Sequence, residues 1–348
     1  MNKIIVCILS ILLFSSIGHT HDLADSMERV LPSITYIRAQ QFTTVKDIDP
    51  VTKEVTEKRV EVNPIVGTGF IIEGNLVVTN HHVIDNAIKN KTEIYVSFIE
   101  DNNRHAATVI GYDKITDVAL LKIEGEYPSI TIAESDSLRM GSEVFTISHF
   151  YGIGWSGTSG IVSSTGRTDP RYPYVNNLQV QLLSGSGSSG GPVFNADGNV
   201  VGINRSIVSM FPRISALGGS GRMLSMVAFP IKGDSMAEAI TAIKEHTIVT
   251  RLDLGVQMIP FGEDSTFHIN KDADFFTGII VYQKDRTSDT TLKSSDLIVS
   301  LDNKTFTSPL EILAYLNENY EAGDIVKLYV YRDEKLINID VTLEVVGH

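Results

Sequence analysis

The sequence predicts a mainly β protein made of two units, a larger all-β barrel or sandwich followed by a smaller α+β unit. From Ile65 to about Ile231, short apolar stretches alternate with Gly, Asn, Asp and Ser, which is the rhythm of strands and turns. A helical pattern over 233–246 interrupts this rhythm, and a second set of strand-like stretches follows Leu252. The length of 348 residues also exceeds what one hydrophobic core usually organises.

Residues 1–18 have the layout of a secretory signal peptide. Lys3 supplies a positive charge, an apolar run extends from Ile4 to Ile17, and Ser16-Ile17-Gly18 offers small residues for cleavage. The run is shorter than the roughly 20 apolar residues of a membrane-spanning helix, although an uncleaved anchor is an alternative. We therefore expect a periplasmic or secreted protein, with membrane contact only if this segment is retained.

Composition and charge exclude some classes of function. Hydrophobic residues make up 43% of the chain and charged residues 20%, as in folded proteins, and the formal net charge is -13. Basic residues are scattered among acidic ones, so nucleic acid is excluded as a partner. Cys7, the only cysteine, lies in the presumed signal, so the mature chain would fold without disulfides, which suits the bacterial periplasm.

The elements of the first unit follow from its apolar stretches. The charged segment from Gln40 to Asn63 is expected to be a surface excursion, a mobile loop. Met236, Ala239, Ile240 and Ile243 share one face of the helix that ends the unit. The expected strands are 69–72, 76–79, 94–98, 118–123, 144–147, 180–183 and 193–194.

The second unit carries a helix with a clear start signal. Ser308-Pro309-Leu310-Glu311 forms a capping box with proline at the first helical position. Leu310, Ile312, Leu313 and Leu316 are then expected to form a buried stripe. Strands are expected at 278–281, 297–301, 326–331 and 337–343.

His82, in Thr79-Asn80-His81-His82-Val83, is the candidate general base. A neutral imidazole can take up a proton near pH 7 and return it when an acceptor holds its other nitrogen. A pair of histidines is more often a surface or structural feature, and metal binding is a further alternative that we do not favour.

Asp117 is the candidate carboxylate that orients His82. It stands where the polar start of 113–123 meets a strongly apolar strand, and a carboxylate there can fix the imidazole tautomer. A lone Asp before a strand usually only closes a turn. Asp113 is the rival candidate, which we interpret as the turn residue.

Ser189 is the candidate nucleophile, in the Gly- and Ser-rich run 184–191. Such a run also suits a flexible linker, but this one is brief and lies between apolar stretches. Glycines allow a turn tight enough to aim the amides of Gly187 and Ser189 at one point, so Gly187, Ser188 and Ser189 are expected to form an oxyanion hole. Each of the three segments is weak evidence for a catalytic residue when taken alone. The order of His82, Asp117 and Ser189 along the chain and their separations in sequence strengthen the prediction of a catalytic triad.

These segments resemble the successive signatures of HtrA/Deg serine proteases. The resemblance rests on Gly67-Thr68-Gly69-Phe70, the Thr-Asn-x-His-Val, Asp-Val-Ala-Leu-Leu-Lys-Ile and Gly-x-Ser-Gly-Gly-Pro segments, and the runs 159–163 and 227–231. It implies a trypsin-like double six-stranded β-barrel at 19–248, a PDZ domain at 249–348, a serine endopeptidase activity without metal or organic cofactor, and a homotrimer or higher assembly.

The resemblance also implies a specificity pocket and a peptide site. Leu183, six residues before the nucleophile, and Ser184 would lie at the pocket, so cleavage after small or medium aliphatic residues is expected. Unfolded polypeptides and protein C-termini are the expected partners. The turn Asp253-Leu254-Gly255-Val256 would hold a peptide's terminal carboxylate, although Leu254 and Val256 could equally be ordinary core positions.

The chain departs from the family pattern near the proposed site. Ser188 stands where Asn is usual, Ser148-His149-Phe150 lies where a Gly-Asn-Pro segment is common, and Gln181 replaces a common Asp. We expect an altered pocket shape and altered loops rather than lost catalysis. A regulatory protease that makes one defined cut in an envelope-stress signalling pathway, and a non-catalytic chaperone or peptide-binding scaffold, are the alternative functions.

Overall fold

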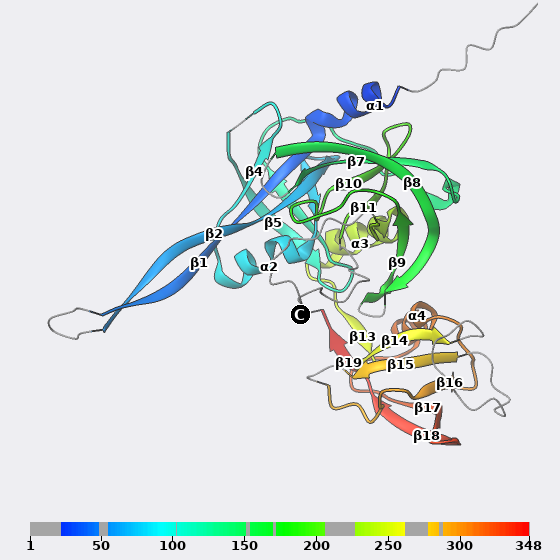
Figure 1. The fold of residues 1–348 in the computed structure, drawn as a ribbon. Coiled ribbons are helices and arrows are strands. Elements are labelled where there is room, and N and C mark those ends of the chain that lie inside the picture. Colours follow the sequence, from blue (N-terminus) through cyan, green and yellow to red (C-terminus); the bar gives the residue numbers. More distant parts are fainter. Residues whose placement is uncertain are drawn as a thin grey trace, which may run out of the picture.

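The computed structural model describes residues 22–48, 55–101, 103–150, 154–169, 172–205, 227–261, 278–284 and 288–347. It has two closed six-stranded barrels followed by a smaller unit with a five-stranded sheet (Figure 1). The predicted fold class is thereby confirmed, as a double barrel rather than a sandwich. The predicted signal at residues 1–18 lies outside the described residues, and within them no helix is both long and apolar enough to cross a membrane.

The first barrel places its strands in the order β1-β2-β3-β6-β5-β4. Its interior is filled by fully buried aliphatic side chains such as Ile37, Ile71 and Leu121. The strands are β1 (Ile34–Ile48), β2 (Val55–Ile72), β3 (Leu76–Thr79), β4 (Ile94–Phe98), β5 (His105–Asp113) and β6 (Val118–Ile123).

The second barrel has the order β10-β11-β12-β9-β8-β7. One apolar core joins the two barrels, in which Phe70 and Leu120 of the first pack with Phe145 and Phe194 of the second. The strands are β7 (Glu143–Phe150), β8 (Gly154–Asp169), β9 (Tyr172–Val180), β10 (Pro192–Asn195), β11 (Val200–Ile203) and β12 (Ile231–Lys232).

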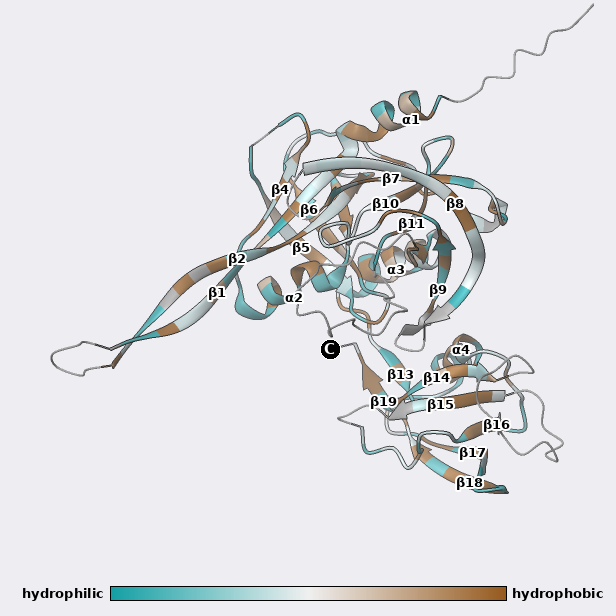
Figure 2. Cartoon of the chain, viewed as in Figure 1, coloured by the Kyte–Doolittle hydropathy of each residue, from teal (hydrophilic) through white to brown (hydrophobic). Residues whose placement is uncertain are grey.

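The mobile loop expected between Gln40 and Asn63 is wrong over its described part. Here β1 and β2 continue past the barrel as a two-stranded arm, paired from Gln41↔Val62 to Ile48↔Val55 (Figure 1). Thr and Val recur along both strands, and such residues favour extended backbone even when charges lie between them. Figure 2 shows hydrophobic and hydrophilic stretches alternating along this arm, as in a ribbon with solvent on both faces.

The strand expected at 180–183 is also too long, because β9 ends at Val180. Leu182 is nevertheless buried, in the core of the second barrel. The apolar side chain of Leu182 therefore reflects packing in the core of the second barrel, and not pairing of this segment as a strand.

Among the residues that the structure describes, the α-helices that accompany the barrels are α1 (Leu23–Val30), α2 (His81–Asn90) and α3 (Gly233–His246). The predicted face of α3 is confirmed, since Met236, Ala239, Ile240 and Ile243 are all buried. Strands of both barrels contact this helix, so α3 closes the core between them.

In the second unit, the five-stranded sheet has the order β14-β15-β16-β17-β18, and β13 pairs separately with β19. Ser308 caps α4 (Pro309–Asn319) as predicted, by accepting the Glu311 backbone N–H at 3.3 Å. Leu310 is exposed, so the buried stripe of α4 consists of Ile312, Leu313 and Leu316. The strands are β13 (Arg251–Asp253), β14 (Val256–Phe261), β15 (Gly278–Lys284), β16 (Leu297–Leu301), β17 (Ile325–Arg332), β18 (Lys335–Thr342) and β19 (Glu344–Val346).

Candidate active site

His82 lies in the first turn of α2, which begins directly after β3. Asn80 is the N-cap residue and is fully buried, and its Nδ2 donates to the backbone carbonyl of Asp117 at 2.9 Å. The backbone N–H of His81 donates to the same carbonyl at 3.2 Å. The start of α2 is therefore fixed to the turn that carries Asp117.

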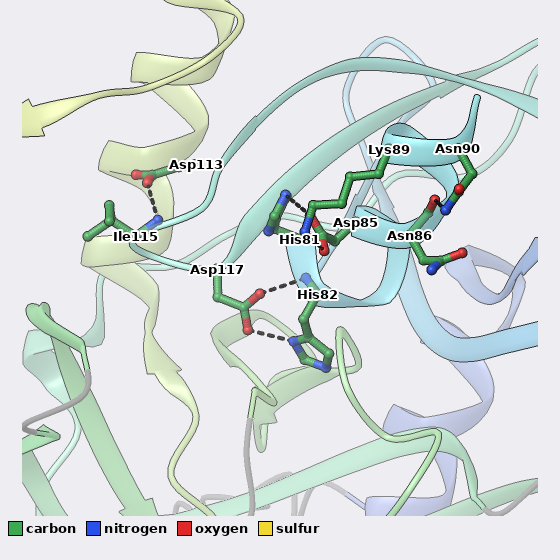
Figure 3. A network of polar contacts seen from close by, with 9 residues as sticks. All are labelled: His81, His82, Asp85, Asn86, Lys89, Asn90, Asp113, Ile115 and Asp117. Carbon is green, nitrogen blue, oxygen red and sulfur yellow. Dashed lines mark hydrogen bonds and ion pairs between the residues drawn. The ribbon is translucent and has the colours of Figure 1, made fainter. Parts of the chain in front are cut away.

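Asp117 ends the β5–β6 turn and holds His82 at two points. Its Oδ2 lies 2.7 Å from Nδ1 of His82, and its Oδ1 accepts the His82 backbone N–H at 2.9 Å (Figure 3). Asp117 has a φ of 60° and is only 3% exposed. Because the carboxylate accepts from Nδ1–H, the neutral ring leaves Nε2 as a proton acceptor.

Asp117 also controls the protonation of His82. Desolvation lowers the pKa of His82, but the hydrogen bond and the charge of Asp117 outweigh it, and the pKa is raised above its ordinary value. The charge of Arg205 opposes this rise. The His82 side chain is 48% exposed, so its ring is open to a substrate.

Ser189 lies beside this pair, in the loop between β9 and β10. Its backbone carbonyl accepts the N–H of Thr68 at 2.8 Å, and a Cβ on the next residue, Gly190, would lie 3.1 Å from the backbone nitrogen of Asn80. The Ser189 hydroxyl donates to the carbonyl of Arg205 at 3.4 Å. Among the contacts of the described residues, no hydrogen bond joins Ser189 to His82.

The carbonyls of the loop around Ser189 are held by hydrogen bonds from neighbouring groups. Gly187 has a φ of 94°, which glycine adopts without the cost that a side chain would add. Its carbonyl accepts the Thr68 hydroxyl at 2.8 Å. Within the described part of the chain, the amides of Gly187 and Ser189 have no hydrogen-bond acceptor, so both remain able to donate to a ligand.

Thr68, on β2, is the residue that sequence reasoning missed. Besides bonding Gly187, its hydroxyl accepts the backbone N–H of His149 at 3.1 Å, and its own carbonyl accepts the Thr79 hydroxyl at 2.9 Å. Its segment contributed to the family resemblance, but nothing in the sequence told which loop the hydroxyl would reach.

Ser188, where the family usually has Asn, braces the base of the loop. Its Oγ donates to the Gly185 carbonyl at 2.8 Å, accepts the Gly185 N–H at 3.2 Å and lies 3.1 Å from the Oγ of Ser184. Ser188 and Ser184 are both buried, whereas Leu183, the other residue expected at the specificity pocket, is partly buried.

The expected peptide-binding turn lies between β13 and β14. Oδ1 of Asp253 accepts the Gly255 N–H at 2.6 Å, so one amide expected to hold a peptide carboxylate already has a carboxylate partner. Leu254 and Val256 are both buried in the core of the second unit. Gly255 has a φ of 72°, and a Cβ there would lie 1.9 Å from Oγ of Ser288.

Within the described part of the chain, no group of three or more His, Cys, Asp or Glu side chains could hold a metal ion. The ring and the backbone N–H of His82 both contact the carboxylate of Asp117, as in a carboxylate–imidazole pair.

Comparison with known proteins agrees with this architecture. Residues 67–203 match the trypsin-like peptidase domain family and residues 252–343 match the PDZ domain family. A probable periplasmic DegP-like serine endoprotease of Marinomonas sp. (strain MWYL1) is 29% identical over 99% of this chain and 77% of the relative. A similarly named protein of Pseudomonas putida (strain W619) is 31% identical over 88% of this chain and 64% of its own length.

Solved structures show the same fold. The HtrA-type protease AlgW with a decapeptide has a TM-score of 0.64 and 23% identity, over 94% of this chain and 99% of that one. The serine endoprotease from Yersinia pestis has a TM-score of 0.59 and 21% identity, over 93% of this chain and 98% of that one. The chain therefore carries a trypsin-like peptidase domain on the barrels and a PDZ domain on the five-stranded sheet, and it is similar to DegP-like and HtrA-type serine proteases.

Proposed function

We propose that this protein is a periplasmic serine endopeptidase that degrades unfolded or mislocalised exported proteins through an acyl-enzyme on Ser189. The observation that carries the proposal is the hydrogen bond between His82 and Asp117, next to a serine whose loop has two amides free to donate. The naming of similar proteins as periplasmic serine endoproteases supports both the activity and the compartment.

In this mechanism, Nε2 of His82 removes the proton from the Ser189 hydroxyl as Oγ attacks the scissile carbonyl. The hydroxyl must first leave the Arg205 carbonyl, which costs little because a 3.4 Å hydrogen bond is long and weak. The amides of Gly187 and Ser189 stabilise the oxyanion. His82 then protonates the leaving amine, and a water molecule, deprotonated by His82, hydrolyses the ester.

Substrate selection is assigned to two places. Leu183 gives the specificity pocket an aliphatic rather than a carboxylate side chain, so cleavage after residues such as Val or Ala is expected. The turn from Asp253 to Val256 would bind C-termini of substrates or activators as an added strand. By family resemblance, the peptidase domains would assemble as a homotrimer.

One experiment tests the reaction. Wild type and Ser189→Ala are compared on unfolded casein, with and without peptides that have hydrophobic C-termini, and the cut sites are identified by mass spectrometry. Wild type alone should degrade casein, with cuts after small aliphatic residues. Equal degradation by both proteins would contradict the mechanism, and cuts after Lys or Arg would contradict the pocket assignment.

A regulatory protease that makes one defined cut is the second candidate. Among the described residues no hydrogen bond joins the Ser189 hydroxyl to His82, and an enzyme that needs a trigger would form this bond only after the activating peptide binds. Casein degradation that depends strictly on added peptide would favour this candidate. A non-catalytic scaffold predicts instead that a fluorophosphonate fails to label Ser189 with or without peptide.

A further inference from the structure

Asp113, at the end of β5, has a fully buried carboxylate that bonds in two directions. Its Oδ1 accepts the backbone N–H of Ile115 at 3.0 Å (Figure 3). The same oxygen accepts the backbone N–H of Thr116 at 3.1 Å. The same carboxylate meets Arg251 side by side, with Oδ1 2.7 Å from one terminal guanidinium nitrogen and Oδ2 2.6 Å from the other. Arg251 is 138 residues away in sequence and begins β13.

The first set of bonds shapes the turn that presents Asp117. Residues 114–117 join β5 to β6, and Asp113 pairs with Val118 across them. With the Ile115 and Thr116 amides tied to Asp113, the turn ends with Asp117 in a left-handed conformation, facing His82. Any movement of this turn displaces the carboxylate that holds His82.

The second set of bonds makes this turn depend on the smaller unit. Arg251 stands two residues before Asp253, the first residue of the expected peptide-binding turn. The backbone of Tyr112 also binds the preceding segment, through the Thr247 carbonyl at 2.8 Å and the Val249 N–H at 3.1 Å. The Asp113–Arg251 ion pair therefore lies where the chain leaves the barrels, between the two proposed sites.

A turn alone does not account for this carboxylate. An asparagine oxygen could accept both turn amides without charge, as in ordinary Asx turns. A buried carboxylate is costly unless it is paired, and the Arg251 guanidinium supplies that pairing through one hydrogen bond to Oδ1 and a close charge contact with Oδ2. The charge of Asp113 is thus required by Arg251 and not by the turn.

We propose that Asp113 is a positioning residue for the Asp117–His82 pair and that Arg251, from the smaller unit, holds it in place. The PDZ-bearing part of the chain then supplies a side chain on which the geometry of the active site depends. This inference rests on the proposed protease function, because it assigns Asp113 a role in the same site.

The test compares Asp113→Asn and Arg251→Lys with a matched control, Arg332→Gln. Arg332 also pairs with a buried carboxylate, that of Asp296, through two hydrogen bonds at 2.6 Å, but inside the second unit. Asp113→Asn keeps an acceptor for the turn and loses the charge, and Arg251→Lys keeps the charge and loses the guanidinium. Each protein is measured for melting temperature, for kcat and KM, and for the His82 pKa.

The His82 pKa is followed by NMR of labelled histidine in a Ser189→Ala background, so that this readout does not require activity. The charges acting on His82 are those of Asp117 and Arg205. We expect both test variants to lower kcat about 10- to 100-fold with little change in KM, as a misplaced catalytic group does. We also expect the His82 pKa to fall toward about 6.5.

Arg332→Gln should lower the melting temperature and leave kcat and the His82 pKa unchanged. The proposal is overturned if Asp113→Asn and Arg251→Lys behave like this control. Absence of hydrolysis by wild type would count against the proposed function alone, since the NMR titration still decides whether Asp113 and Arg251 position His82.

Discussion

The carboxylate of Asp117 contacts both the ring and the backbone of His82. One carboxylate oxygen lies 2.7 Å from Nδ1, and the other accepts the His82 backbone N–H at 2.9 Å. This double contact fixes both the direction of the imidazole and the nitrogen that carries the proton. It also ties helix α2 of the first barrel to the β5–β6 turn.

Asp117→Asn should leave the protein folded and reduce kcat about 10³- to 10⁴-fold, because an amide can stabilise the wrong imidazole tautomer. Steady-state kinetics on a peptide substrate measures the loss, and KM should change little. Asp85→Asn is the control, since Asp85 contacts the neighbouring His81 at 3.5 Å rather than His82. A fall in kcat of less than about tenfold in Asp117→Asn would contradict the assigned role.

The dependence of kcat/KM on pH should show an acidic limb with an apparent pKa above about 6.5, the ordinary value for histidine. The pKa of His82 is raised by Asp117 against desolvation, so the imidazolium persists to higher pH and the base is lost earlier on acidification. Burial lowers the pKa of both His81 and His149, so neither accounts for such a limb. A limb below pH 6.5 would argue against His82 as the base.

The same raised pKa has a consequence for stability. Because the folded pKa lies above the unfolded one, the contribution of His82 is fully present below about pH 6.5 and is lost as pH rises through the folded pKa. Catalysis and stability therefore respond to pH in opposite directions in this window. Melting curves of wild type and His82→Ala across pH 5 to 9 should converge on the alkaline side.

Thr68→Val should lower kcat about 10- to 100-fold, because the Gly187 carbonyl loses the hydroxyl that anchors it at 2.8 Å and the oxyanion loop is free to shift. Thr79→Val is a matched control, since Thr79 is equally buried and its hydroxyl bonds the carbonyl of Thr68. Both variants should lose about 1–3 kcal/mol of unfolding free energy, measured in urea. Equal kcat values in the two would show that Thr68 is structural only.

Asp253→Ala should tighten binding of a peptide with a hydrophobic C-terminus about 3- to 10-fold. The change frees the Gly255 N–H and removes a negative charge that repels the peptide carboxylate. Asp253→Asn, which keeps an acceptor, should have an intermediate effect in fluorescence anisotropy titrations. Asp340→Ala controls for net charge, because Asp340 lies on β18, at the edge of the five-stranded sheet opposite β14. Equally tighter peptide binding by Asp340→Ala would contradict a local effect of Asp253.

The sequence by itself determined the two units, the buried face of α3 and the residue types of the candidate site. These features are local, because a helical stripe, a capping serine such as Ser308, or a glycine-rich turn is encoded within a few neighbouring residues. The arm formed by β1 and β2 was missed because its charges obscured the β-branched residues, and because pairing between strands is not written in either strand alone.

Only the tertiary structure decided which distant groups meet. The Ser189 hydroxyl bonds Arg205, Thr68 anchors Gly187, and Asp113 pairs with Arg251, across separations of 16, 119 and 138 residues. Each contact depends on strand register, on the path of the chain between the barrels and on how the two units join. The identity of a side chain tells what it can bind, whereas the folded path of the chain brings its partner within reach.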